Sequence, residues 1–111
     1  MAALIGNHNI EVYQGADFSY VITIKDNEGV PINLTGCTLS GRIREEYGVG
    51  TAYDFSFDLM DMVNGKFKMY MSHTVTSTLT FRKAVYEVDI TYSDGTIDTF
   101  LYGNVVVRTQ V

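Results

Sequence analysis

The strongest constraint in this sequence is the regular spacing of its turn signals. About seven stretches rich in β-branched and aromatic residues are separated by clusters of turn-forming residues. The clusters are QGAD at residues 14–17, KDNEG at 25–29, VNG at 63–65 and SDG at 93–95. Because tight turns reverse the chain and no connection is long enough for a parallel crossover, this spacing predicts a small antiparallel β-sandwich.

Side chains within these stretches alternate between apolar and polar types, which is the periodicity of a β-strand. The first short strand is expected at residues 9–13, and the clearest alternation follows in residues 17–25. The apolar set of that second strand is Phe18, Tyr20, Ile22 and Ile24. The same alternation recurs in residues 37–44, 53–59 and 84–92.

Two glycines give local predictions. The dipeptide Asn64-Gly65 is the best hairpin signal in the chain and predicts a turn that leads into a strand at residues 67–71. Gly103 lies inside the final apolar run, residues 96–107, where it predicts a bulge or a close approach of another backbone segment.

Residues 73–81 lack the strand alternation and predict a different element. Ser72 or Thr74 can cap a single helical turn, with Val75 and Leu79 as its apolar contacts. A turn of this kind fits a crossover between the two sheets.

Tyr86 has two interpretations. In immunoglobulin-like sandwiches, a tyrosine two residues before a core position of the penultimate strand bonds to upstream backbone and forms a tyrosine corner. Val88 would hold that core position here, although the Cys pair and Trp of antibody domains are missing. A tyrosine that only packs in the core is the alternative.

The expected fold class follows from these patterns. Residues 1–111 are predicted to form a single domain, an all-β, immunoglobulin-like antiparallel β-sandwich of about seven strands with one short helical turn in a crossover. A chain of this length buries roughly two-thirds of its unfolded surface, so neither metal nor disulfide is needed for a stable core. Cys37 is the single cysteine and is expected to be a buried, inert thiol.

Composition excludes several classes of partner. The net charge of -5 and the pI near 4.7 argue against nucleic-acid binding, which needs a basic face. The clustered cations Arg42, Arg44, Arg82 and Lys83 are explained by a solvated strand face. No segment approaches the ~20 apolar residues of a membrane span, and no secretion signal is recognised, so a soluble protein without a membrane role is expected.

Candidate chemistry is sparse. His8 and His73 lie near opposite ends of the chain and form no metal-binding spacing with each other or with Cys37. Asp54, Asp58 and Asp61 suggest paired carboxylates or calcium, but Asp54 and Asp58 fall on a polar strand face where solvation explains them. We therefore expect no enzymatic activity, no catalytic or metal site and no cofactor.

The aromatic residues point instead to protein contacts. Eight tyrosines and six phenylalanines exceed the needs of the predicted core faces. The tyrosines expected at an interface, at strand ends or on mixed faces, are Tyr13, Tyr47, Tyr53 and Tyr70. The final strand, apolar through residues 105–107, is predicted to be either fully buried or an edge that another chain covers.

Several motifs, taken in order, resemble small immunoglobulin-like virion proteins of tailed bacteriophages. They are the QG turn at Gln14-Gly15, the D-x-x-G-x-P-x-x-L-T-G segment at residues 26–36, the T-x-x-L turn at 76–79, Y-x-x-D at 86–89 and L-x-G-x-V-x-V at 101–107. The chain looks like the domain found at the N-terminus of phage baseplate upper proteins and in related tail and fibre-associated proteins. Arg82-Lys83 departs from the Pro-Gly-like turn that is common in that family.

This resemblance implies a non-enzymatic structural component of a virion, made in the host cytoplasm, at the tail, baseplate or fibre junction. Its partners would be other virion structural proteins, with a homo-oligomer inside the particle as a further option. The alternatives are a capsid (head) decoration protein and, from a different class, a carbohydrate- or receptor-binding module that uses tyrosine-rich loops.

Overall fold

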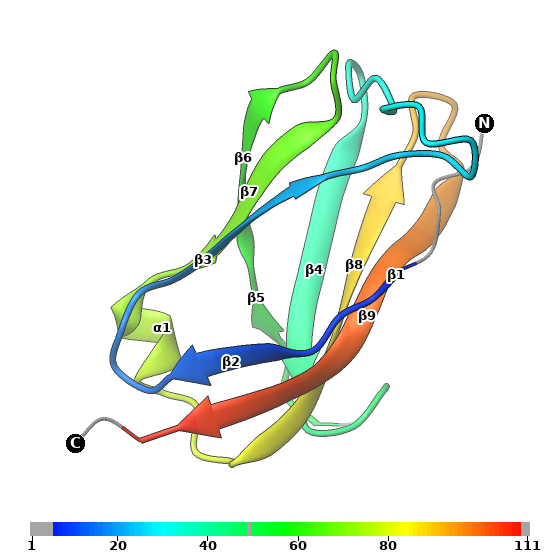
Figure 1. The fold of residues 1–111 in the computed structure, drawn as a ribbon. Helices are drawn as coiled ribbons and strands as arrows, with labels where there is room; N and C mark the ends of the chain where they lie inside the picture. Colours follow the sequence, from blue (N-terminus) through cyan, green and yellow to red (C-terminus); the bar gives the residue numbers. More distant parts are fainter. Residues whose placement is uncertain (1–5, 49, 110–111) are drawn as a thin grey trace.

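Two β-sheets face each other in the computed structural model, which describes residues 6–48 and 50–109 (Figure 1). The strands are β1 (Gly6–Asn7), β2 (Ile10–Tyr13), β3 (Phe18–Thr23), β4 (Thr38–Arg44), β5 (Tyr53–Asp54), β6 (Ser56–Asp61), β7 (Lys66–Met71), β8 (Lys83–Thr91) and β9 (Ile97–Arg108). One short helix, α1 (His73–Thr76), lies between β7 and β8. The six-stranded sheet has the order β1-β9-β8-β4-β5, with β2 also paired to β9, and the three-stranded sheet has the order β3-β7-β6.

The predicted all-β, immunoglobulin-like sandwich with one short helical turn is confirmed. Strands β3, β7 and β6 take the places of B, E and D of an immunoglobulin domain, and β4, β8 and β9 take those of C, F and G. The described residues contain nine strands instead of about seven, because the strand predicted at residues 53–59 is divided into β5 and β6, and the unpredicted β1 precedes the first predicted strand.

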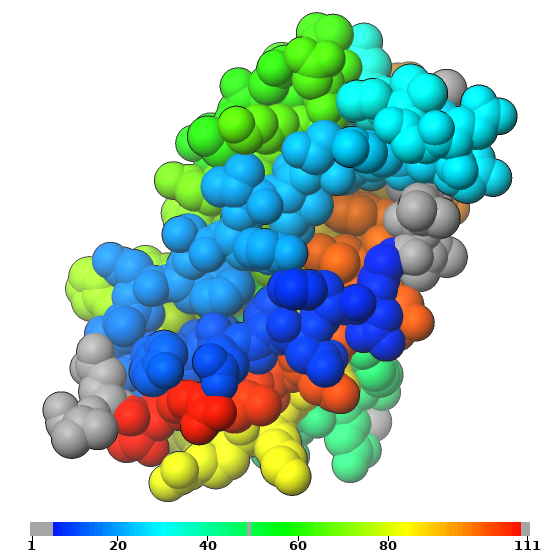
Figure 2. Space-filling view, viewed as in Figure 1, coloured from blue at the N-terminus to red at the C-terminus, as the bar shows by residue number. Residues whose placement is uncertain are grey.

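The N-terminal strands correct the expectation of a purely antiparallel arrangement. Both β1 and β2 pair with β9 in parallel, with Gly6 opposite Leu101 and Ile10 opposite Val105. Figure 2 shows this blue segment lying along the orange and red β9. Parallel pairing needs a long connection, and here the whole intervening domain supplies it. Turn spacing between consecutive strands could not reveal that pairing.

A second difference lies at Phe55. The predicted continuous strand over residues 53–59 leaves one sheet and joins the other at this point, since β5 pairs with β4 while β6 pairs with β7. The Phe55 N–H donates to Gly41 O over 2.9 Å, which ends the pairing with β4. The Phe55 side chain is buried between the sheets, so the alternation of faces continues through the change of sheet.

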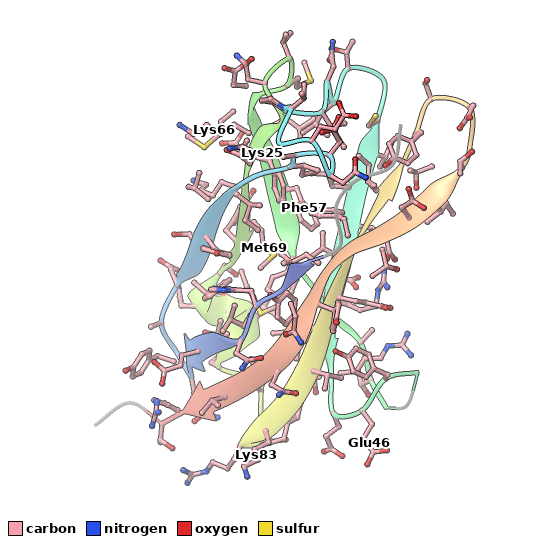
Figure 3. The ribbon with its side chains drawn as sticks, turned by 45° about the vertical axis from the view of Figure 1, so that its right-hand side comes forward. Lys25, Glu46, Phe57, Lys66, Met69 and Lys83 are labelled. Carbon is pink, nitrogen blue, oxygen red and sulfur yellow. The ribbon has the colours of Figure 1, made fainter. Side chains whose placement is uncertain are left out.

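The core is filled by the alternating apolar side chains that the sequence indicated. Phe67 is fully buried on β7, and its ring centroid lies 5.9 Å from those of both Phe57 on β6 and Phe100 on β9. Tyr86 on β8 meets Phe55 edge to face, with centroids 6.1 Å apart. These rings join the two sheets, and Figure 3 shows Phe57 and Met69 between them.

The predicted hairpin after β6 is confirmed, with a four-residue connection at residues 62–65. Gly65 has a φ of 70°, and a Cβ there would lie 2.7 Å from the carbonyl oxygens of Ile24 and Ile32. The Gly65 carbonyl accepts the Ile24 N–H over 2.9 Å. A glycine at this position therefore allows the hairpin to pack against the segment that follows β3.

The predicted helical crossover is also confirmed, but its cap differs from the prediction. Ser72 holds the N-cap position without a side-chain cap bond. Asp17 takes that role from the β2–β3 turn, because its Oδ1 accepts the backbone N–H of His73 over 2.7 Å. Buried Thr76 ties the same turn down: its hydroxyl donates to Ala16 O at 2.8 Å and accepts the Gly15 N–H at 3.1 Å.

Gly103 marks a close backbone approach, the second of its two predicted roles. A Cβ on Gly103 would lie 2.1 Å from His8 O in the segment that joins β1 to β2. The bulge in β9 does not lie at Gly103. It lies where the register of the pairing with β8 shifts, between Val88 and Asp89. Phe100 and Leu101 are consecutive buried residues at that bulge.

Tyr86 makes the buried backbone bond that the sequence suggested, although its partner is distant. Its hydroxyl donates to His8 O over 2.5 Å, 78 residues upstream. A tyrosine corner would bond a few residues upstream, so Tyr86 instead attaches the N-terminal segment to β8. Burial raises the pKa of Tyr86, with smaller contributions from Tyr20 and Tyr47, so the hydroxyl keeps its proton.

Substituting Tyr86→Phe is expected to lower the free energy of unfolding by about 1 to 3 kcal/mol, because His8 O loses its bond while the aromatic packing remains. Chemical denaturation of both proteins measures the difference. Tyr102→Phe, which removes a hydroxyl from an exposed ring on the next strand, is the control. An unchanged denaturation midpoint for Tyr86→Phe would leave Tyr86 as a packing residue only.

Candidate interface surfaces

The structure separates the four tyrosines that were predicted at an interface. Tyr13 ends β2 and Tyr47 lies in the β4–β5 loop, and their exposed fractions are 49% and 52%. Tyr70 is 37% exposed on the outer face of the three-stranded sheet, with Lys68 Nζ 5.3 Å from its ring centroid. Tyr53 is half-buried on β5, and its ring meets Phe81 at 5.7 Å. Tyr53 therefore contributes to packing within the domain.

Tyr13 and Tyr47 belong to the outer face of the six-stranded sheet. The Tyr47 hydroxyl lies 3.4 Å from Gly103 O, which places its ring over β8 and β9. Burial, followed by the negative charge of Glu87, raises the pKa of Tyr47. The outward residues of β9 add Ile97, Tyr102 and Val106, whose exposed fractions are 63%, 36% and 36%.

Sequence analysis did not identify Ile97, Tyr102 and Val106 as surface residues, because apolar residues fall on both faces of the final run, residues 96–107. The structure excludes the edge alternative for this run, since β9 has β8 on one side and β1 and β2 on the other. Its inward residues Val105 and Val107 are buried. The run is therefore buried on one face only, and the other face is open.

The same outer face carries a charge cluster. Arg42 Nη1 lies 3.0 Å from Glu87 Oε1 and 3.3 Å from Asp89 Oδ2, and all three side chains are partly buried. Asp89 also accepts the Thr99 hydroxyl over 2.7 Å. Because Arg42 is shared by the two carboxylates, this cluster explains Arg42 as part of the sheet surface.

A groove at the C-terminal end of β9 holds the other cations. We name it the cationic groove; its principal lining residues are Tyr13, Arg82, Lys83, Val106 and Arg108. Its volume is about 620 Å³ and it is open to solvent. Arg82 and Lys83 are exposed at its rim, beside the partly exposed Val106. The clustered cations of the sequence are thus divided between this groove and the sheet face of Arg42.

A second open groove lies at the opposite end of the sandwich, between the β3–β4 loop and the β8–β9 turn. Its lining includes Pro31, Tyr92, Asp94 and Asp98. The neighbouring hairpin adds three exposed apolar side chains to which sequence analysis assigned no role. They are Met60, Met62 and Val63. An apolar pair inside a turn is a signal from which their exposure could have been predicted.

The remaining chemical candidates do not form a site. Asp54, Asp58 and Asp61 are exposed, and Asp61 accepts the side-chain amide of Asn64 over 2.9 Å. The His8 ring stacks on Tyr20, with centroids 4.9 Å apart. The His73 ring nitrogen Nδ1 lies 2.9 Å from Asp17, and the backbone N–H of His73, followed by that ring contact, lowers the pKa of Asp17.

Cys37 is half-buried, which corrects the prediction of a fully buried thiol. It precedes β4, where the chain has just left the β3–β4 loop, and its Sγ lies 4.0 Å from Asn33 O. Within residues 6–48 and 50–109, no group of three or more His, Cys, Asp or Glu side chains is placed to hold a metal ion. The same residues contain no helix with the length and apolar character of a bilayer span.

Comparison with known proteins supports the fold and goes no further. No protein-family model and no curated protein matches this chain. Among solved structures, the crystal structure of the R347E mutant of the SrpA adhesin from Streptococcus sanguinis is similar, with a TM-score of 0.51 and 14% sequence identity. The match covers 98% of this chain and 57% of the adhesin chain. The chain is thus a β-sandwich with structural similarity to part of a bacterial adhesin.

Proposed function

We propose that this chain is a non-enzymatic structural component of a tailed-phage virion that assembles at the tail, baseplate or fibre junction. The ordered motifs from Gln14-Gly15 to the L-x-G-x-V-x-V strand supply the reason for choosing a virion. One structural observation carries the interface role: aromatic and aliphatic side chains, led by Tyr13, Tyr47 and Ile97, stand exposed on the outer face of the six-stranded sheet. Exposed aromatic residues of this kind are enriched where proteins contact one another.

The shape of the surface favours assembly over sugar binding. A glycan- or receptor-binding module needs a concave site in which several groups converge on the ligand. The two grooves at the ends of the sandwich are open and contain one tyrosine each, Tyr13 and Tyr92. The outer sheet face, in contrast, offers a broad surface of the kind that a neighbouring subunit covers. An interface of standard size buries roughly 800 Å² on each partner.

Purified particles provide the test. Mass spectrometry should find the chain in virions, and a particle density map should place it in the tail, baseplate or fibre region. The double variant Tyr13→Ser/Tyr47→Ser should fold, because both side chains are about half exposed, yet be incorporated several-fold less than the natural protein. Val21→Ser, an exposed apolar change on the three-stranded sheet, is the matched control.

Two results would overturn this proposal. The chain could be missing from purified virions, or particles assembled without it could be complete and equally infectious. Density on the capsid instead of the tail would replace the proposed position with head decoration.

A further inference from the structure

The cationic groove and the β8–β9 turn lie at opposite ends of the same two strands. Pairing of β8 with β9 runs from Lys83 opposite Val106 at one end to Thr91 opposite Ile97 at the other. In Figure 3, Lys83 lies at the foot of β8, far from Lys25 and Lys66. Each end therefore presents its own surface to a neighbouring molecule.

The cationic groove contains positive charge that no described carboxylate neutralises. Arg82 and Lys83 are exposed and form no ion pair with residues 6–48 or 50–109. Arg108, in the same groove, is paired with Glu11 over 2.6 Å. Glu46 lies at this end of the molecule but on the separate β4–β5 loop, outside the groove. The groove is thus locally basic in a chain whose net charge is -5.

The β8–β9 turn at the other end, residues 92–98, has the complementary character. Asp94 is exposed and Asp98 is half-buried, and both line the second groove. Ile97 lies on the other face of β9 from Asp98, and at 63% it is the most exposed large apolar residue of the described chain. Asp94 Oδ1 accepts the Thr96 N–H over 2.9 Å, and this bond lowers the pKa of Asp94 and keeps it ionised. The Tyr92 N–H donates to Thr96 O over 2.8 Å, which holds the turn in a narrow, projecting shape.

We propose that the cationic groove of one copy binds the β8–β9 turn of a second copy. The two carboxylates of the turn would meet Arg82 and Lys83, while Ile97 would cover Val106 and the ring of Tyr13. Apolar contact at the centre with opposite charges around it is the ordinary composition of a protein interface. Local charge complementarity selects a second copy as the occupant, because the chain itself carries both halves of the contact.

The geometry makes this contact heterologous, since the two surfaces differ and lie at opposite ends. A head-to-tail contact does not close on itself in a dimer, so repeating it builds either a ring or an open filament. This inference concerns self-association in solution and does not depend on the proposed virion role. The two can fail separately, because one is measured on the purified chain and the other on particles.

Sedimentation velocity of the purified chain over a range of concentrations is the first measurement. At about 0.01 M salt, where the Debye length is about 30 Å, the average mass should rise with concentration. At about 1 M salt, where that length is about 3 Å, the mass should return toward that of a monomer. A chain that stays monomeric at the highest concentration in low salt would overturn the proposal.

Charge reversal at each end tests the pairing itself. Arg82→Glu/Lys83→Glu makes the groove acidic, and Asp94→Lys/Asp98→Lys makes the turn basic. Each variant alone should self-associate at least about tenfold more weakly, because like charges then face each other. A mixture of the two should associate again, since each groove then meets a turn of opposite charge. Lys66→Glu/Lys68→Glu, which has the same charge change as the groove variant but lies on the three-stranded sheet, should associate like the natural chain.

Circular dichroism of each variant checks that it is folded, because Asp94→Lys also removes the bond to Thr96. Ile97→Ser keeps that bond and should also weaken association at least about tenfold, by removing the exposed apolar contact. Association that survives both charge reversals and Ile97→Ser, or a mixture that stays monomeric while the natural chain associates, would show that the contact lies elsewhere.

Discussion

Replacing Gly103 with valine is expected to lower the free energy of unfolding by about 3 kcal/mol, at the upper end of what overpacking costs. Any side chain at Gly103 must displace His8 O, which a Cβ would approach to 2.1 Å. That displacement also breaks the bond from the Tyr86 hydroxyl, whose acceptor is the same oxygen. The substitution should therefore loosen the N-terminal segment from β9, and hydrogen exchange at the His8 N–H, which donates to Tyr102 O, should accelerate.

Gly6→Ala is the control for this experiment. Gly6 lies in the same N-terminal segment, but a Cβ there meets the nearest atom, on the Leu101 side chain, at an ordinary 3.7 Å. Its denaturation midpoint should stay close to that of the natural chain. Equal stability of Gly103→Val and Gly6→Ala would contradict the close approach of the two backbone segments.

Truncating Phe67 to alanine is expected to cost about 3 to 5 kcal/mol, the range found for large aromatic residues in cores. Phe67 is fully buried and contacts rings from both sheets, so its loss opens a cavity between them. Small domains have only about 5 to 15 kcal/mol of stability, so this variant should be close to unfolding at room temperature.

Tyr70→Ala is the matched control, because it removes an aromatic ring from the same strand on the exposed face. Urea denaturation of both variants gives the comparison, and Tyr70→Ala should change stability by less than about 1 kcal/mol. Similar losses for the two variants would mean that β7 does not present alternate faces to core and solvent.

The strands were predictable because their signals are local. Alternation at Phe18 to Ile24, the Asn64-Gly65 dipeptide and the unpatterned residues 73–81 each act over a few positions. The parallel pairing of β2 with β9, the transfer of the chain between sheets at Phe55 and the cap from Asp17 are not local. Each depends on which distant segments come into contact, and a single sequence does not show these contacts directly.

The candidate surface was predicted less well than the fold. Tyr13, Tyr47 and Tyr70 are exposed as expected, but Tyr53 packs inside the domain. The alternation of side chains shows on which face of a strand a ring lies, but it does not show how much of the ring neighbouring segments cover. Ile97 was not recognised as a surface residue because an apolar residue at the start of a strand is usually interpreted as part of the core. Its exposure arises because its side chain lies on the outer face of β9, away from the opposite sheet.

The parallel pairing of β1 and β2 with β9 also has a consequence for the order of folding. Asn104 donates its N–H to Asn9 Oδ1, a contact that closes a loop of 95 residues. Until the ribosome has released residue 108, the open edge of β8 and the apolar side chains of β2 have no partner. Folding of such non-local sheets takes milliseconds to seconds. The nascent chain must therefore pass through a period in which these strands are uncovered, and aggregation during synthesis competes with completion of the larger sheet.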